Sequence, residues 1–182
     1  MSKMKISGSE SPIGKIFGDD TLYTVPLYQR PYAWAAEQSE ELLQDLLRAM
    51  RGGEEPIDDL PPYFFGSIVL IKDDELDAKV VDGQQRLTTL TMLLAVLRSL
   101  IKSENADALT DFLCEKGNLI KGIPKRYRLR PRKQDAEFFE KYIQDEGGIE
   151  ELRGYIPCFP GLSICPVTLR YQTFRGYSFI RI

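Results

Sequence analysis

Histidine is absent from all 182 residues of the chain. Ser-His-Asp and Cys-His catalysis, histidine-ligated zinc sites and nuclease motifs with a histidine base are therefore excluded within this sequence. Cysteine is scarce, and Cys114, Cys158 and Cys165 form neither a CxxC pair nor an even disulfide set. Reduced thiols fit this pattern best, so we expect a cytoplasmic protein.

Long apolar runs and an excess of positive charge are also missing. The run from Leu90 to Leu97 contains Thr91 and is far too short to cross a bilayer, so we expect no membrane partner. The polar segment Met1–Ser11 does not resemble a signal peptide. A net charge of -3 argues against a strongly basic nucleic-acid-binding surface, although a local basic face is compatible with it.

The most informative stretch is VVDGQQRLTTL, from Val80 to Leu90, in which a strand pattern leads through an Asp-Gly turn into a long helical pattern. Unpaired N–H groups at the start of a helix favour anions, and the planar cation of Arg86 suits phosphate oxygens. Gly83 permits a tight turn and a close ligand, and Asp82 could hold a metal ion or orient a water molecule. The alternative is an ordinary turn followed by a solvated helical turn.

A second polar stretch, YQRPYAW at residues 28–34, contains two tyrosines, the only tryptophan, a glutamine and an arginine. Buried aromatic side chains would hold such a loop in place. One interpretation makes it a second arm of the ligand site, with Gln29 and Arg30 facing phosphate or base. The other makes it a core-packing loop with a surface arginine, since aromatic side chains in loops usually pack.

Hydrophobic periodicity predicts the main elements of the fold. Helical spacing of apolar residues marks residues 37–50, 86–102 and 134–144, of which the second is expected to be a buried central helix. Strand patterns mark residues 22–27, 63–71 and 79–81. The near-continuous apolar run at 63–71 predicts a central strand, in which Gly66 marks a bulge or a close backbone approach.

RYRLRPR at residues 126–132 is the most basic stretch of the chain. Alternation along a strand would place its first three arginines, Arg126, Arg128 and Arg130, together on one face. Such a strand could approach the phosphates of a nucleotide or a nucleic acid. A solvated edge strand that is guarded by charge is the other interpretation.

The end of the chain differs in composition from the rest. Residues 152–182 contain no Asp, Glu or Lys, and prolines and glycine interrupt any regular pattern. We therefore expect one domain over residues 1–150 and an atypical tail over residues 151–182. This tail is either a truncated or frame-shifted end or a set of two or three edge strands.

Three segments together resemble a known family. They are VPLYQRPYAW (25–34), FGSIVL (65–70) and VDGQQRLTTL (81–90), and they are similar to the N-terminal domain of the GmrS/SspE-type proteins, a ParB/sulfiredoxin-like family with a DGQQR signature. Their order and approximate spacing match, and the resemblance covers roughly residues 11–144. It implies an α+β, ParB/sulfiredoxin-like fold in which helices pack on a small mixed sheet.

The resemblance also implies a function. It predicts binding and hydrolysis of a nucleoside triphosphate, with Mg2+ as the expected metal, in the regulatory domain of a modification-dependent, phage-defence restriction endonuclease. Modified DNA is one expected partner. The other is an HNH-type nuclease domain or subunit, because this histidine-free sequence holds no HNH-type motif. A homo-oligomer is compatible with this interpretation. The alternatives are a ParB-like DNA-sensing module that recognises phosphate without hydrolysis, and a scaffold for a nuclease subunit.

Matching positions give each residue an expected role. Asp82 would bind the metal or position the attacking water, and Arg86 would offset the charge on the transferred phosphoryl group. The remaining nucleotide-binding residues would be Gly83, Gln84, Gln85, Gln29 and Arg30. The residues expected to contact DNA are Tyr28, Tyr32, Arg126, Arg128 and Arg130.

Overall fold

A small mixed sheet forms the base of the fold. The computed structural model describes residues 6–18, 21–51, 55–72, 76–101, 104–117, 120, 122 and 124–155. Four strands pair in the order β2-β3-β1-β6, with the bounds β1 Leu22–Thr24, β2 Val69–Lys72, β3 Asp77–Asp82 and β6 Leu129–Arg130. β1 runs parallel to both β3 and β6, whereas β2 runs antiparallel to β3. The predicted α+β fold with a small mixed sheet is therefore confirmed.

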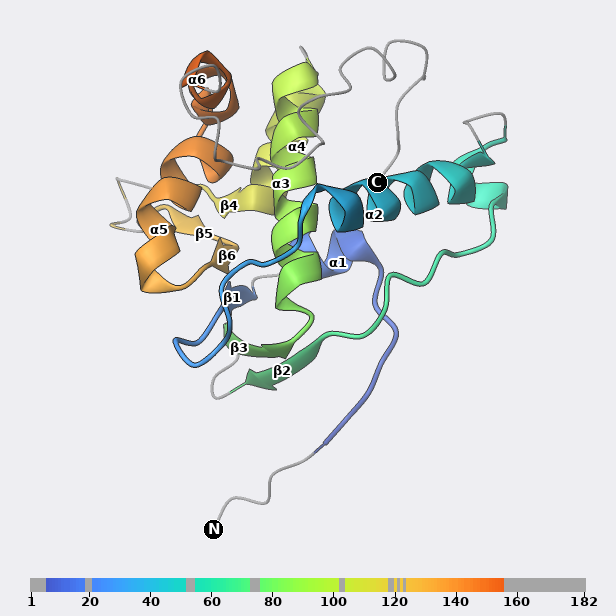
Figure 1. Cartoon of the computed structure of the whole chain (residues 1–182), viewed down its shortest axis with the longest axis horizontal. Coiled ribbons are helices and arrows are strands. Elements are labelled where there is room, and N and C mark those ends of the chain that lie inside the picture. The colour runs from blue at the N-terminus through green and yellow to red at the C-terminus, as the bar shows by residue number, and fades with distance from the viewer. Residues whose placement is uncertain are drawn as a thin grey trace.

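Helices cover this sheet. They are α1 (Ile13–Gly18), α2 (Ala36–Ala49), α3 (Gln84–Leu100), α4 (Glu104–Leu113), α5 (Lys133–Phe139), the π-helical turn η4 (Glu140–Gln144) and α6 (Gly148–Tyr155). A 3-10 turn, η2 (Ile57–Asp59), and a second sheet of β4 (Cys114–Glu115) and β5 (Arg126–Tyr127) accompany them. Figure 1 shows α3 in the middle of the molecule, with β2 and β3 below it, α4 packed along it, and α5 and α6 to one side.

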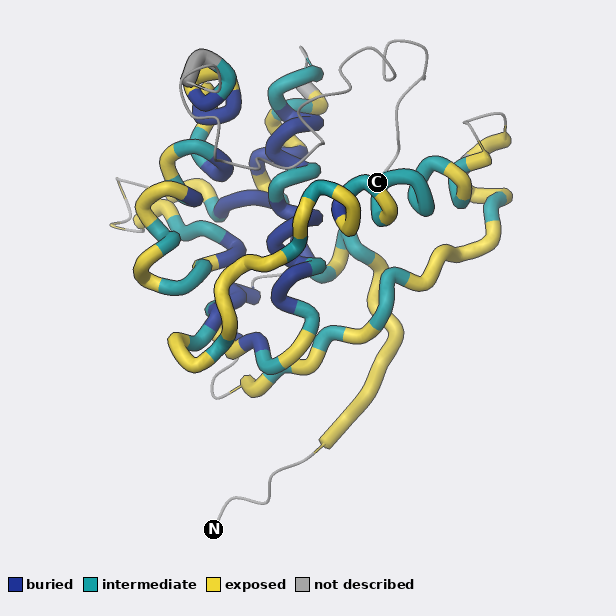
Figure 2. Tube along the Cα trace, in the orientation of Figure 1, coloured by how far each residue is buried: buried dark blue, intermediate teal, exposed yellow. Residues whose placement is uncertain are grey.

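The predicted central helix is the core of the fold. Leu87, Leu90, Leu94 and Leu97 are all buried, and the buried part of the chain in Figure 2 follows α3 and the strands next to it. Most of its polar residues are buried as well, but each threonine hydroxyl donates to a carbonyl four residues earlier, as Thr89 does to Gln85 at 2.9 Å. Each of these buried hydroxyl groups therefore has a hydrogen-bond partner.

The prediction of a central strand over residues 63–71 is wrong. β2 begins only at Val69 and lies at the edge of the sheet, where Val69 and Ile71 remain 47% and 46% exposed. Gly66 interrupts the extended backbone because its φ is +93°. The short strand β1 takes the central place instead, and its parallel neighbour β3 is anchored by the fully buried Ala78 and Val80.

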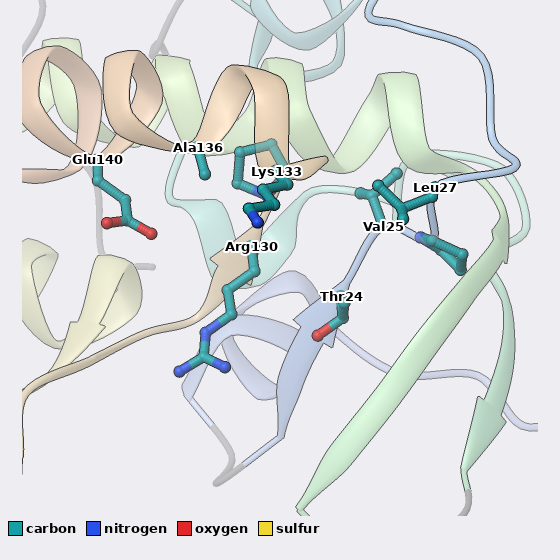
Figure 3. A pocket seen from close by; sticks show the side chains of 9 residues that line it. Thr24, Val25, Leu27, Arg130, Lys133, Ala136 and Glu140 are labelled. Atoms are coloured by element: carbon teal, nitrogen blue, oxygen red, sulfur yellow. The ribbon is translucent and has the colours of Figure 1, made fainter.

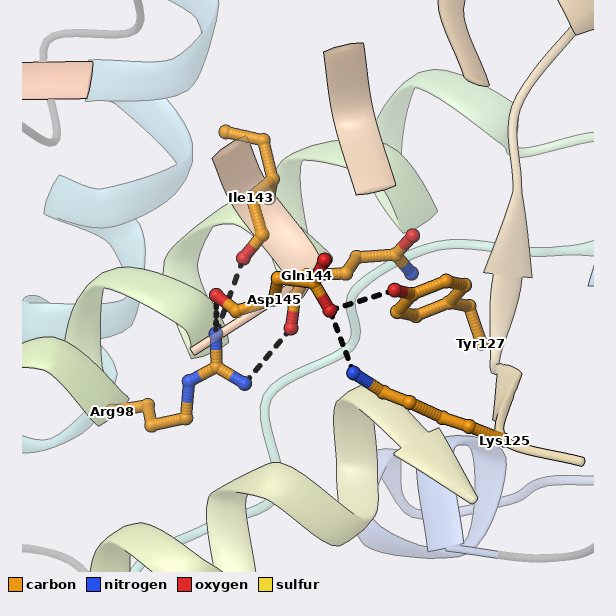
Figure 4. Close-up of polar contacts among 6 residues, drawn as sticks. All are labelled: Arg98, Lys125, Tyr127, Ile143, Gln144 and Asp145. Carbon is orange, nitrogen blue, oxygen red and sulfur yellow. Dashed lines mark hydrogen bonds and ion pairs between the residues drawn. The ribbon is translucent and has the colours of Figure 1, made fainter. Parts of the chain in front are cut away.

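A buried arginine ties the end of η4 to the central helix. Arg98 of α3 donates from its guanidinium to the carbonyl oxygens of Gln144 at 2.9 Å and Asp145 at 2.7 Å (Figure 4). The Asp145 carboxylate accepts from Lys125 at 2.6 Å and from Tyr127 at 2.7 Å. Burial, with this hydrogen bond, raises the pKa of Tyr127 to about 12. Side chains of α3 and of residues 125–127 thus meet at the end of η4.

The C-terminal helix crosses the expected domain boundary at residue 150. α6 runs from Gly148 to Tyr155, and its Leu152 is buried in the core. The rest of the expected tail, residues 156–182, lies outside the described residues. None of the described helices has both the length and the apolar character needed to span a lipid bilayer.

Arg98→Met should destabilise the fold by about 3 kcal/mol, because buried carbonyl oxygens at the end of η4 would lose their charged donors. Urea denaturation followed by circular dichroism would measure the loss. The control is Arg48→Met, since the Arg48 side chain is 74% exposed in a surface ion pair with Asp45 and should contribute less than about 0.5 kcal/mol. Equal losses in the two variants would contradict the role given to Arg98.

Candidate functional site

The turn between β3 and α3 builds the first half of the site. Gly83 precedes the helix with a φ of +86°, and a Cβ atom there would lie 3.1 Å from the Ser67 carbonyl oxygen. Only glycine fits both the conformation and the space. Leu87 donates the first helical N–H bond of this turn, to the Gly83 carbonyl at 3.0 Å, so the N–H groups before it have no helical partner. Asp82, the last residue of β3, is exposed and comes directly before Gly83 in the chain.

The loop at residues 28–34 is fixed to this corner by Gln85. The Gln85 Oε1 atom accepts from the backbone N–H groups of Ala33 at 2.8 Å and Trp34 at 3.2 Å. Its Nε2 atom donates to the Pro31 carbonyl at 3.0 Å. One buried side-chain amide therefore makes three hydrogen bonds to backbone groups that lie more than fifty residues earlier in the chain.

Two further glutamines complete the attachment. Gln84 donates from Nε2 to the Arg30 carbonyl at 3.1 Å, and Gln29 donates from Nε2 to the Val81 carbonyl at 2.8 Å. The loop is thus held mainly by amide hydrogen bonds and not by buried aromatic side chains, because Tyr28 is 72% exposed. The amides of all three glutamines, which we expected to face a nucleotide, bond the protein backbone in this structure.

At the start of α3 and in the loop at residues 28–34, Arg30 and Asp82 keep charged side chains available. Both are exposed, and within the part of the chain that the structure describes neither side chain makes a hydrogen bond or an ion pair. Tyr32, by contrast, places its hydroxyl 3.0 Å from that of Thr89 on α3 and 3.2 Å from that of Ser39 on α2. Tyr32 therefore connects the loop to two helices, whereas Tyr28 faces solvent.

Arg86 is held against the segment that precedes β2. Its guanidinium donates to the Ser67 carbonyl at 3.0 Å. A Cβ atom on Gly66 would lie only 2.7 Å from the Arg86 Cζ atom, so the guanidinium rests directly on the glycine backbone. The sequence pointed to a close backbone approach at Gly66, but it did not identify Arg86 as the approaching group or Ser67 as its partner.

The three arginines of the basic stretch do not share a face. Arg126 is paired with Glu115, whose carboxylate accepts from Nε at 2.8 Å. Arg128 is buried at a bend between β5 and β6, while Arg130 is exposed. The single alternating strand that we predicted is wrong, because the chain leaves the second sheet at this bend to place Leu129 in the core.

The protein groups at the corner could hold a metal ion only if a bound phosphate ligand supplied further oxygen atoms. Among the described residues, no group of three or more cysteine, aspartate or glutamate side chains could hold a metal ion. Asp82 supplies one carboxylate at the corner. Mg2+ is usually bound by one or two carboxylates, substrate phosphates and water. Asp82 therefore fits a Mg2+ ion that arrives bound to a triphosphate.

Comparison with known proteins identifies the family of the chain. The family model described as GmrSD restriction endonuclease, N-terminal domain, matches residues 13–164. The match includes the DGQQR corner, the loop at 28–34 and the segment around Gly66. No curated protein matches the chain.

Gln85→Leu should detach the loop from α3, because three backbone groups would lose the amide that bonds them. We expect the amide protons of Ala33 and Trp34 to exchange with deuterium about ten times faster, and the stability to fall by 1–3 kcal/mol, roughly. Gln134→Leu is the control, since Gln134 is exposed and makes no side-chain hydrogen bond to the described residues. Unchanged exchange in Gln85→Leu would show that the loop is held by other contacts.

Gly66→Ala should displace the Arg86 guanidinium, because the added methyl group would overlap it. Gly147→Ala is a matched control: Gly147 also has a positive φ, of +78°, but a Cβ atom there meets nothing within 4 Å. Both changes should cost roughly 1–3 kcal/mol of backbone strain. Only Gly66→Ala should shift the nuclear magnetic resonance of the Arg86 Nε–H group. The same shift in both variants, or in neither, would contradict the contact.

Proposed function

Because the chain belongs to the family of GmrSD restriction endonuclease N-terminal domains, we propose that it binds and hydrolyses a nucleoside triphosphate as the regulatory domain of a modification-dependent restriction system. It acts in the cytoplasm, and a separate HNH-type nuclease domain or subunit cuts the DNA. The observation that supports this proposal is the corner at the start of α3. There, helix N–H groups and a carboxylate that have no partner among the described residues lie with an arginine within one turn of chain.

The corner offers each group that phosphoryl transfer needs. The first N–H groups of α3 and the positive end of its dipole would bind phosphate oxygens. Arg86 would offset the charge that develops on the transferred phosphoryl group. A guanidinium has five N–H donors, so Arg86 can keep its bond to Ser67 while it binds phosphate. Asp82 would position the attacking water or share a Mg2+ ion with the phosphates.

The loop at residues 28–34 would form the opposite wall of the site. Gln84 binds the Arg30 carbonyl, and Gln29, the residue before Arg30, binds the Val81 carbonyl, which leaves the Arg30 guanidinium able to approach a phosphate. In this proposal the three glutamines of the motifs act by positioning, since their amides already bond the backbone. Their substitution would then change nucleotide affinity through the position of the loop.

Asp82→Ala and Arg86→Ala should each abolish phosphate release from nucleoside triphosphates in the presence of Mg2+, with the melting temperature of the chain unchanged. Asp82 is exposed and Arg86 is half-buried and absent from the hydrophobic core, so neither change removes core packing. The control for Asp82 is Asp77→Ala, an exposed carboxylate at the start of the same strand, which should hydrolyse at the parental rate. Parental rates in both site variants would overturn the proposal.

The exposed loop favours a second candidate function, a ParB-like DNA-sensing module without hydrolysis. Tyr28 is 72% exposed beside the unpartnered Arg30, and such a pair could contact a base and a phosphate. This function predicts DNA binding that weakens steeply with salt, with no phosphate release from any nucleotide. Measuring both properties of the same preparation separates the two functions.

A further inference from the structure

A pocket of about 340 Å³ lies at the ends of β1 and β6, and none of the residues of the DGQQR corner lines it. Its walls come from the chain that follows β1 and from the start of α5 and η4 (Figure 3). Lys133, Ala136 and Glu140 lie at helical spacing and present one helix face to it. Its volume is near the lower end of the range for small-ligand pockets.

The charged groups of the pocket are unpaired. Arg130, Lys133 and Glu140 make no side-chain hydrogen bond or ion pair with any residue that the structure describes. The arginines around them are used differently, because Arg126 pairs with Glu115 and Arg132 pairs with Asp135 at 2.9 Å. Two cations with no internal partner in one pocket indicate a site for an anionic group.

The rest of the lining is apolar. Pro26, Leu27, Pro131 and Ala136 contribute to it, and Leu27 is 74% exposed. An apolar wall beside two cations and one carboxylate fits a ligand that joins a flat, weakly polar ring to a phosphate. A nucleotide has this composition: its base would pack on the prolines, its phosphate would face Arg130 and Lys133, and an amino group of the base could donate to Glu140.

We propose that this pocket binds one unstacked nucleotide of a DNA strand. The neighbouring residue of the same loop, Tyr28, is exposed next to Leu27, and an adjacent base can stack on it. A strand has this second base, whereas a free nucleotide does not. The inference rests on the proposed role in DNA restriction, but it does not depend on nucleotide hydrolysis at the DGQQR corner.

Fluorescence anisotropy with labelled oligodeoxycytidine of about 12 nucleotides tests the pocket. Arg130→Ala combined with Lys133→Ala should weaken binding about tenfold, and the slope of log affinity against log salt should fall by about 0.7, for the one phosphate contact that is lost. Arg48→Ala combined with Lys116→Ala is the matched control. It removes one arginine and one lysine from surface ion pairs elsewhere and should bind like the parent.

Two further variants test the shape and the base contact. Ala136→Phe fills the pocket without changing its charge and should weaken binding as strongly as the double variant, with an unchanged melting temperature. Glu140→Leu should reduce the preference for oligodeoxycytidine over oligothymidine, because thymine has no exocyclic amino group. A parental chain without measurable DNA binding, or equal losses in the two double variants, would overturn the proposal.

Competition with free deoxycytidine monophosphate tests whether the strand is required. At equal nucleotide concentration it should compete poorly, and equal competition would overturn the assignment to DNA. Nucleoside triphosphate hydrolysis is measured in the same preparation. DNA binding through the pocket without hydrolysis would contradict the proposed function alone. Hydrolysis combined with parental DNA binding by Ala136→Phe would contradict the pocket alone.

Discussion

The hydrogen bonds of Gln85 are the constraint on which the candidate site depends. The loop at residues 28–34 forms no strand or helix, so its backbone N–H and C=O groups need partners from elsewhere. A side-chain amide on the first turn of the rigid helix α3 supplies three of them. Two segments more than fifty residues apart in the chain therefore become one structural unit, and the Arg30 backbone is held at the start of α3 as part of it.

The positive charges around the basic stretch differ in whether they have a hydrogen-bond or ion-pair partner among the described residues. The chain has a net charge of -3, and most arginines around its basic stretch are buried or paired. The buried Arg98 and Arg128 donate hydrogen bonds to backbone carbonyls inside the protein. Within the described residues, Arg30, Arg130 and Lys133 are left without such partners. An acidic chain thus presents local cationic groups beside the strand ends.

The parallel strands explain why these groups lie there. β1, β3 and β6 run in the same direction, so their carboxyl ends meet at one edge of the sheet, the usual place for ligands in open parallel sheets. The chain leaving β1 contributes Pro26 and Leu27 to the pocket and Gln29 and Arg30 to the corner. One loop therefore borders both places at which we propose that phosphates bind.

The sequence by itself determined the central helix, the strand-to-helix corner and the family, because apolar spacing and a DGQQR turn are local properties of the chain. The predicted alternation of Arg126, Arg128 and Arg130 failed, as did the central strand at 63–71. Both depended on which neighbour each backbone segment pairs with, and on a bend and a positive φ that tertiary packing selects. Tertiary structure alone decided that the glutamine amides bond the loop, that Arg86 rests on Gly66 and that the chain after β1 lies across a pocket from α5. Each of these contacts joins segments whose distance in space no local pattern encodes.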